Sequence, residues 1–412
     1  MQFLTHTLPN GLQVVAECND EAHSTALGFF VKTGSRDEDD AISGVSHFLE
    51  HMVFKGTPRR SADDVNREFD EMGAHYNAFT NEENTVYYAA VLPEHQDHAV
   101  DLLADILRPA LRDDDFNTEK QVILEEIQMY EDQPPFGADD KCRALYFGAH
   151  PLGRSVLGTS ESIEALPVEA MRDYFCRRYS PTNIVLAGAG RIEFERLVRQ
   201  AETLCGAWER VAASRDTGRA APCAGFHVLS KEIATQQYVL QIAPGPASED
   251  EDRHAAKLLA TVLGDDSGSR LYWEIVDPGL AEHVSLSHGE HQGTGMMMTY
   301  MSCDPEHVQG NLQRIFDIYR TAEAKGITSV ELEQAKNKIR SRIVLSSERP
   351  RGRLFAVGND WVYRQQYQTV AEELAVIARI TVDDVMAVLT KYPLSRTTTV
   401  TIGPLEKVAA PA

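Results

Sequence analysis

The length of 412 residues predicts two domains or one large one, and the composition of 43% hydrophobic and 25% charged residues is typical of a globular protein. Its formal net charge of -22 argues against nucleic acid or an anionic membrane surface as a partner. No uninterrupted apolar run approaches the roughly 20 residues that span a bilayer. The six cysteines are scattered without a C-x-x-C pair, which predicts reduced thiols and a cytoplasmic location.

The N-terminus lacks the basic start and apolar core of a signal peptide. It predicts a strand that enters a turn at residues 10–11. Residues 12–16 and 25–31 are expected to form two antiparallel strands leading to the stretch 43–54.

The stretch 43–54 predicts an amphipathic helix. Ser43 is a suitable cap for its first turn, and Gly56 ends the pattern. Its apolar positions recur at three- and four-residue steps: Val45, Phe48, Leu49, Met52 and Val53.

The same helix carries the pattern H-x-x-E-H, the inverzincin arrangement of zinc peptidases. His47 and His51 stand one turn apart, so both imidazoles can reach one zinc ion. Glu50 lies beside them and is left free to act on a water. The alternative is two solvated histidines and a glutamate on a surface helix, and a third ligand elsewhere should decide between the two.

Further along, a helix over 62–72 capped by Ser61, a hairpin of 74–80 with 85–92 and a helix opening at Pro93 are expected.

Residues 113–132 predict a long helix that ends before Pro134-Pro135. One of its faces is built from Glu119, Val122, Ile123, Glu126 and Tyr130. Glu126 therefore points inward with the apolar residues, whereas Glu125 is rotated about 100° toward solvent. A carboxylate on an inward face needs a partner, and a zinc ion held by the two histidines would be one.

The second half of the chain repeats the alternation of strands and helices predicted for the first, which suggests an ancient duplication. A buried strand follows the turn at 178–183, and a helix over 191–209 precedes the small, polar, aperiodic linker 211–222. We therefore expect a zinc-bearing domain at 1–210 and a homologous second domain at 223–412. Its expected strands are 238–242, 296–301 and 397–402, and its expected helices are 252–263, 269–275, 308–324 and 329–345.

The chain resembles the pitrilysin and mitochondrial-processing-peptidase family of zinc peptidases, in its half-length bacterial branch. In that family H-x-x-E-H is followed some seventy-odd residues later by a pattern like Glu-Lys-x-Val-x-x-x-Glu, which the segment 119–126 matches. Other matching stretches are 9–12, 73–80 and 179–183. The resemblance covers nearly the whole chain and implies an α+β fold of two similar domains, each a mainly antiparallel sheet flanked by helices.

The resemblance also implies the roles of the site residues. One zinc ion would be held by His47, His51 and Glu126, with water as the fourth ligand, and Glu50 would be the general base. Glu119 would orient a histidine or the water.

The resemblance further implies that Asn77 and Ala78 offer backbone groups to an extended peptide, which adds to the sheet as a strand. The alternative for Asn77 is a turn-former beside a strand.

The second half departs from the family pattern, which normally supplies an arginine and a tyrosine that bind substrate and stabilise the oxyanion. The tyrosine position holds Glu282, and the arginine position holds Val276 or Ile275. A carboxylate at this place would repel the developing negative charge. We therefore expect a heterodimer in which a sister subunit supplies the missing pair, and weak or no activity from this chain alone.

The sequence thus predicts a zinc endopeptidase subunit that cuts unfolded peptides within a closed chamber. A non-catalytic scaffold subunit of the same family is the alternative, and a zinc-storage or sensor protein is a weaker one. Zinc is the family expectation, because the ligand types alone do not exclude cobalt or manganese.

Overall fold

The computed structural model describes residues 1–132 and 137–412, so the predicted helix stop at Pro134-Pro135 lies outside the described residues. The contacts divide the chain into two compact units. Unit 1 consists of Met1–Gln128, Arg154–Asp216 and Val344–Thr369. Unit 2 consists of Met129–Gly153, Thr217–Ile343 and Val370–Ala412.

Unit 1 is built on a sheet with the strand order β1-β2-β6-β3-β5-β4. The hairpin of β1 and β2 is confirmed, whereas β2 and β3 are separated by β6, which pairs with both. All residues of β6 are buried, which its mostly apolar sequence allows. Among the neighbouring pairs, β2 and β6 are parallel and the others antiparallel. The strands are β1 (Gln2–Thr7), β2 (Gln13–Cys18), β3 (Thr25–Val31), β4 (His75–Thr80), β5 (Thr85–Val91) and β6 (Ile184–Gly190).

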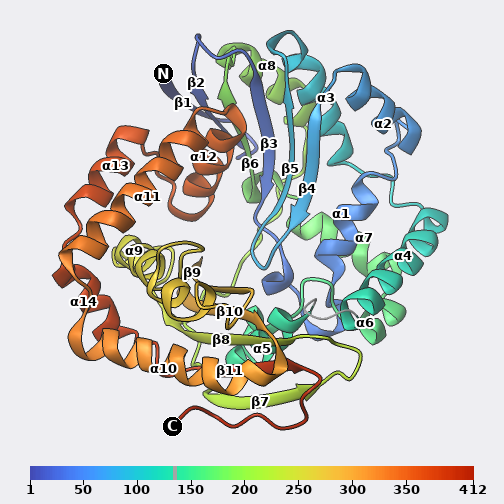
Figure 1. Cartoon of the computed structure of the whole chain (residues 1–412). Helices are drawn as coiled ribbons and strands as arrows, with labels where there is room; N and C mark the ends of the chain where they lie inside the picture. Colours follow the sequence, from blue (N-terminus) through green and yellow to red (C-terminus); the bar gives the residue numbers. More distant parts are fainter. Residues whose placement is uncertain (133–136) are drawn as a thin grey trace. The chain divides into compact units, whose positions relative to one another are not determined.

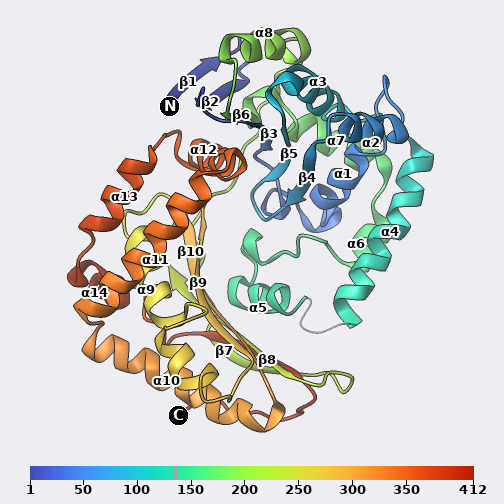
Figure 2. The ribbon, with the colours of Figure 1, turned by 45° about the horizontal axis from the view of Figure 1, so that its top comes forward.

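Helices pack on both faces of this sheet (Figure 2). α1, α3 and α8 contact one face, and α12 contacts β2, β3 and β6 from the other. Alternate strand residues therefore enter two different apolar cores, as the two-residue period of a strand requires. The helices of unit 1 are α1 (Val45–Val53), α2 (Ala62–Glu71), α3 (Gln96–Ile106), α4 (Asp113–Asp132, of which residues up to Gln128 belong here), α6 (Ser160–Ala165), α7 (Val168–Arg178), α8 (Phe194–Cys205) and α12 (Pro350–Arg364).

Unit 2 has a sheet with the order β7-β11-β8-β10-β9 (Figure 1). In unit 1 the last strand, β6, lies between β2 and β3 and is parallel to β2. In the same way, the last strand of unit 2, β11, lies between β7 and β8 and is parallel to β7. The expected α+β fold of two similar domains with mainly antiparallel sheets is therefore confirmed. The strands are β7 (Gly225–Ser230), β8 (Gln237–Gly245), β9 (His283–His291), β10 (Thr294–Cys303) and β11 (Thr398–Gly403). The helices are α5 (Ala138–Phe147), α9 (Arg253–Gly264), α10 (Val308–Lys325), α11 (Ser329–Ser347, of which residues up to Ile343 belong here), α13 (Val370–Arg379) and α14 (Val382–Lys391).

The compact units differ from the expected boundaries of 1–210 and 223–412, which stay a prediction for the homologous domains. The chain does pass from unit 1 to unit 2 within the expected linker, at Asp216–Thr217. Two segments lie outside the expected boundaries, however: Val344–Thr369 belongs to unit 1 and Met129–Gly153 to unit 2. α12 packs on the sheet of unit 1, where the Arg353 guanidinium pairs with the buried Glu17 carboxylate at 2.6 Å. α5 packs on β8 and β11 of unit 2.

Most of the predicted elements are found within one or two residues of their expected bounds. The segment 269–275 is different: Arg270 and Leu271 are α-helical, and Tyr272–Val276 then continues as a π-helix. The predicted helix 191–209 is confirmed but shorter, since α8 ends at Cys205.

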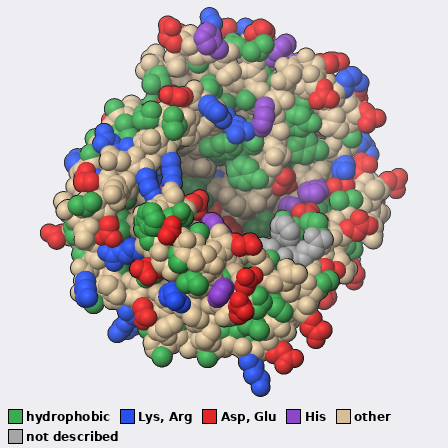
Figure 3. Space-filling view, in the orientation of Figure 1, with side chains coloured by type: hydrophobic (Ala, Val, Ile, Leu, Met, Phe, Trp, Pro, Cys, Tyr) green, Lys and Arg blue, Asp and Glu red, His purple; other side chains and the backbone are tan. Residues whose placement is uncertain are grey.

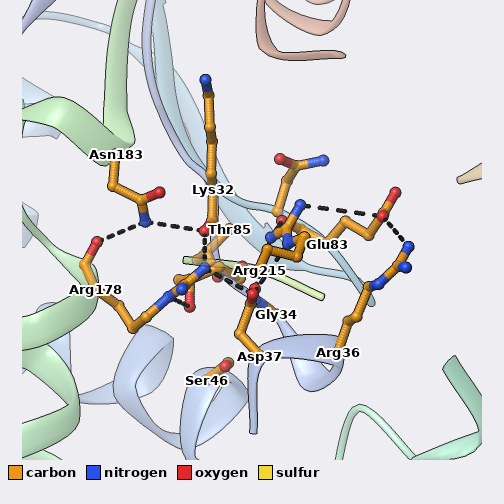
Figure 4. Close-up of polar contacts among 12 residues, drawn as sticks. Lys32, Gly34, Arg36, Asp37, Ser46, Glu83, Thr85, Arg178, Asn183 and Arg215 are labelled. Atoms are coloured by element: carbon orange, nitrogen blue, oxygen red, sulfur yellow. Dashed lines mark hydrogen bonds and ion pairs between the residues drawn. The ribbon is translucent and has the colours of Figure 1, made fainter. Parts of the chain in front are cut away.

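A buried cluster of ion pairs holds the start of the linker on unit 1 (Figure 4). The Arg215 guanidinium bonds to the Asp37 carboxylate at 2.6 Å and also donates to the backbone oxygen of Glu83. Arg178 pairs with Asp37 at 2.7 Å, and Arg36 pairs with Glu83 at 2.8 Å. Because Glu83 lies in the turn between β4 and β5, the same cluster fixes the end of β4.

The acidic side chains on the face shown in Figure 3 are scattered among basic and neutral ones rather than gathered in one patch. The large negative charge is therefore spread over this face. Within the described ranges, no helix has both the length and the apolarity needed to cross a membrane.

Candidate metal centre

The helix α1 is held in place by its buried apolar face. Val45, Phe48, Leu49 and Val53 are fully buried, and the Phe48 ring stacks on Phe116 of α4 at a centroid distance of 4.7 Å. This contact brings α4 alongside α1, so polar residues on the two helices meet.

The start of α1 differs from the prediction, because Gly44 rather than Ser43 occupies the cap position. Gly44 has φ 89°, and a Cβ there would lie 2.4 Å from the backbone oxygen of Leu157, so both conformation and space require glycine. The Glu38 carboxylate accepts hydrogen bonds from the backbone N–H groups of Gly44 (2.7 Å) and Ser46 (2.8 Å). It thus performs the capping role, and burial raises its pKa to about 7.

Three predicted ligands face one another on α1 and α4. The Nε2 atoms of His47 and His51 each lie 3.8 Å from Oε2 of Glu126. The nitrogen and oxygen atoms that could bind a metal ion all lie within 4.8 Å of one another. Among the described residues, this is the cluster of three side chains that could hold a metal ion. Burial lowers the pKa of His47 to about 3, which keeps its imidazole in the neutral form that binds metal.

This donor set fits a zinc ion. Two imidazole nitrogens and one carboxylate oxygen form the three-ligand set of a catalytic zinc site, which leaves a fourth position for water. Separations of 3.8 Å are too long for hydrogen bonds between the ligands, yet they suit atoms that share an ion at about 2 Å from each. The half-buried Glu126 carboxylate, whose pKa is raised by burial, gains a compensating charge from such an ion.

Glu119 contacts one of the predicted ligands. Its Oε1 lies 2.8 Å from Nδ1 of His51, so the ring donates there and keeps Nε2 free for metal. Its Oε2 pairs with the Lys55 ammonium at 2.5 Å. Burial raises the pKa of the Glu119 carboxyl, but the bonds from His51 and Lys55 outweigh this effect and lower it overall.

The side chain of Glu50 is held by Thr80, the last residue of strand β4. The Thr80 hydroxyl donates to Oε2 of Glu50 at 2.7 Å, and burial raises the pKa of that carboxyl. Sequence reasoning did not single out Thr80 or Lys55. A signal for Thr80 was available, because it alternates with Ala78 and Tyr76 on the face of β4 that meets α1.

The buried face of α4 differs in part from the predicted one. Val122 is 43% exposed, and the buried positions are instead Phe116, Glu119, Ile123 and Ile127. Glu126 lies at the border of this face and is partly buried, while Glu125 is exposed as predicted.

The strand β4 lies at the edge of its sheet and contains the predicted peptide-binding residues. Asn77 lies in the middle of β4, so it is not a turn residue. Its side-chain oxygen accepts from the Ala78 amide at 2.9 Å, an amide that an arriving strand would take over.

In unit 2, the segment that departs from the family pattern runs from the end of the π-helix to the residue before β9. Glu282 is exposed, and its backbone N–H donates to the oxygen of Ser302 at 3.0 Å. The sequence has no arginine or tyrosine at these positions, and the expected consequence for catalysis stays a prediction.

Comparison with known proteins gives consistent matches along the chain. Residues 13–160 match the family described as insulinase (peptidase family M16), and residues 165–339 match the peptidase M16 inactive domain. A protein of Mycobacterium tuberculosis named as an uncharacterized zinc protease is 34% identical over 397 residues, covering 95% of this chain and 90% of its own. A Bacillus subtilis protein with the same description is 34% identical over 370 residues, covering 89% and 90%.

Solved structures share the fold. A protease from Helicobacter pylori has a TM-score of 0.91 at 21% identity and covers 98% of this chain and 99% of its own. A chain of complex III2 from Candida albicans has a TM-score of 0.84 at 17% identity, with 98% and 96% covered.

Proposed function

Because this chain belongs to the insulinase family of peptidases (M16), whose relatives are named zinc proteases, we propose that it is a zinc-dependent endopeptidase subunit. The observation that carries the proposal is the convergence of His47, His51 and Glu126, with Glu50 beside them on α1 and free of the ligand set. A purely structural metal site gains nothing from a free carboxylate held in this way.

The ligand set would hold one zinc ion, which supplies a Lewis acid that lowers the pKa of a coordinated water. Glu50 accepts a proton from the attacking water while the water oxygen bonds to the carbonyl carbon of the peptide. The same carboxyl then gives that proton to the amide nitrogen as the C–N bond breaks. Thr80 holds Oε2 of Glu50, which leaves the other oxygen to move the proton.

The free edge of β4 would align the substrate. An extended peptide that pairs with β4 would pass the end of the strand, where Thr80 holds Glu50. Pairing requires an unfolded segment, because folded chains offer few free strand edges. We therefore propose unfolded peptides as the substrates, within the closed chamber that the family resemblance implies.

Completion of the site by a sister subunit is part of the proposal. The exposed Glu282 stands where the family places an oxyanion donor, and a carboxylate there disfavours the charge that develops on the carbonyl oxygen. A partner chain with an arginine and a tyrosine would supply that donor.

The six cysteines are free thiols, which supports the proposed cytoplasmic location.

The decisive experiment follows hydrolysis of a quenched unstructured peptide by this chain alone and co-purified with a sister chain, each with and without a chelator. We expect activity in the pair, lost with the chelator and in Glu50→Gln. The matched control is Glu125→Gln, an exposed glutamate on α4, which should leave the rate unchanged.

Two results would change the proposal. Activity of the chain alone would show that Glu282 is no handicap and would remove the need for a sister subunit. Bound zinc without hydrolysis in any combination would refute the peptidase proposal and favour the scaffold alternative.

A further inference from the structure

The edge strand β4 presents two different faces along its length. Tyr76, Ala78 and Thr80 face α1 and α2, where Tyr76 stacks on Phe69 at 3.9 Å and Thr80 meets Glu50. The alternate residues are all exposed and face the side of α12: His75, Asn77 and Phe79.

Contacts from α12 identify this second face. The Phe79 ring lies 5.9 Å from that of Phe355 on α12, and Nη1 of Arg351 lies 3.3 Å from Nε2 of His75. A peptide that pairs with β4 would therefore direct every second side chain toward α12.

A cavity of 610 Å³ opens at the His75 end of β4. Besides His75, its lining includes Arg349 and Arg351 from the first turn of α12 and the segment before it. The third arginine of the lining, Arg353, is already committed to the buried Glu17.

Arg351 is an exposed cation whose charge is not neutralised. In the part of the chain that the structure describes, no ion pair is found for Arg351 or Arg349. Glu21 and Glu348 also line the cavity, but neither pairs with Arg351. The guanidinium instead contacts His75, the first residue of the edge strand, where an added strand would lie.

We propose that Arg351, together with His75, forms a subsite for an acidic side chain of the peptide, about five residues from the cleaved bond. The spacing follows from the strand. Glu50 meets β4 at Thr80, five residues after His75, a span of about 17 Å. Positions five apart face opposite sides of a strand, so a peptide residue opposite Thr80 faces α1 and one opposite His75 faces α12.

An aspartate or glutamate at this position would accept a charge-assisted hydrogen bond from the planar guanidinium. The inference rests on the proposed function, because it assumes that peptides pair with β4. It adds a sequence preference to that pairing.

The test measures binding and does not require hydrolysis. Zinc-loaded Glu50→Gln protein is titrated into labelled unstructured peptides in which one glutamate is moved stepwise through a serine- and glutamine-rich sequence. We expect about fivefold tighter binding when the glutamate occupies one particular position, by comparison with the all-neutral peptide. High salt should weaken this preference, because it is electrostatic.

The same titration is repeated with Arg351→Gln and with Arg199→Gln, which removes an exposed arginine on α8 and serves as the matched control. The preference should vanish in the first and persist in the second. A preference that survives Arg351→Gln, no preference at any position, or no binding of any peptide would overturn the inference. If wild-type protein co-purified with its sister chain fails to hydrolyse these peptides while the preference persists, the proposed function is refuted and the subsite stands.

Discussion

Replacing Glu119 by glutamine tests whether this buried carboxylate tunes the metal site. The change keeps the size of the side chain but removes the charge that faces Nδ1 of His51 at 2.8 Å and the Lys55 ammonium at 2.5 Å. The imidazole then loses its anionic acceptor, so its Nε2 becomes a weaker donor to zinc and its ring is held less firmly. Lys55 is partly exposed and can turn to solvent, so the fold should persist.

Losses of this kind lower metal affinity by about 10- to 100-fold, or about 1.4 to 2.7 kcal/mol. Because Glu119 is only 3% exposed, water cannot replace its bond to His51 readily, and we expect about 30-fold. The assay is competition for zinc between the protein and a chromogenic chelator at constant pH. Glu125→Gln on the same helix is the control. A zinc affinity of Glu119→Gln within twofold of wild type would refute the reasoning.

Three further changes probe the supports of the site. Thr80→Val should lower kcat by about tenfold or more with little change in KM, because Glu50 loses its hydroxyl donor, whereas Thr80→Ser should retain activity in the peptide assay. Glu38 has a pKa of about 7 in the folded chain and 4.5 ordinarily, so the folded state binds the extra proton between these values and stability falls as pH rises through that window. The difference in unfolding free energy between pH 5 and pH 8 should be smaller in Glu38→Gln than in wild type by about 2.5 kcal/mol, and an equal difference in both proteins would contradict this assignment. Glu17→Gln should destabilise unit 1 by about 3 to 5 kcal/mol in urea unfolding, since it leaves the Arg353 guanidinium buried without its carboxylate, and replacing both residues by apolar ones should recover most of the loss.

The predictions that succeeded rest on local patterns. The step of three and four residues in 45–53 and 113–132 is a property of the helix itself, so both helices are confirmed within two residues of their predicted bounds. The geometry of His47 and His51 follows from the same helical period. Glu126 was singled out because an inward carboxylate demands a partner of opposite charge, and it does lie beside the two histidines, whereas its role as a metal ligand stays a prediction.

The predictions that differed depend on residues far apart in the chain. Ser43 was a reasonable cap by type, yet Glu38 takes that role from a loop that the sequence does not place beside the helix. Val122 shares the helical spacing of buried residues but is exposed, because burial depends on what packs against α4. The cation beside Glu119 and the hydroxyl beside Glu50 likewise come from other turns and strands.

Sequence alone therefore determined the helices, the strand alternation, the spacing of the predicted ligands His47 and His51, and the family, because each depends on spacings of a few residues. Tertiary structure decided which residues support those ligands and where the units exchange segments. It placed β6 between β2 and β3, α12 on the sheet of unit 1 and α5 on that of unit 2. These choices depend on which apolar faces bury each other, and that competition is settled only when the whole chain is packed.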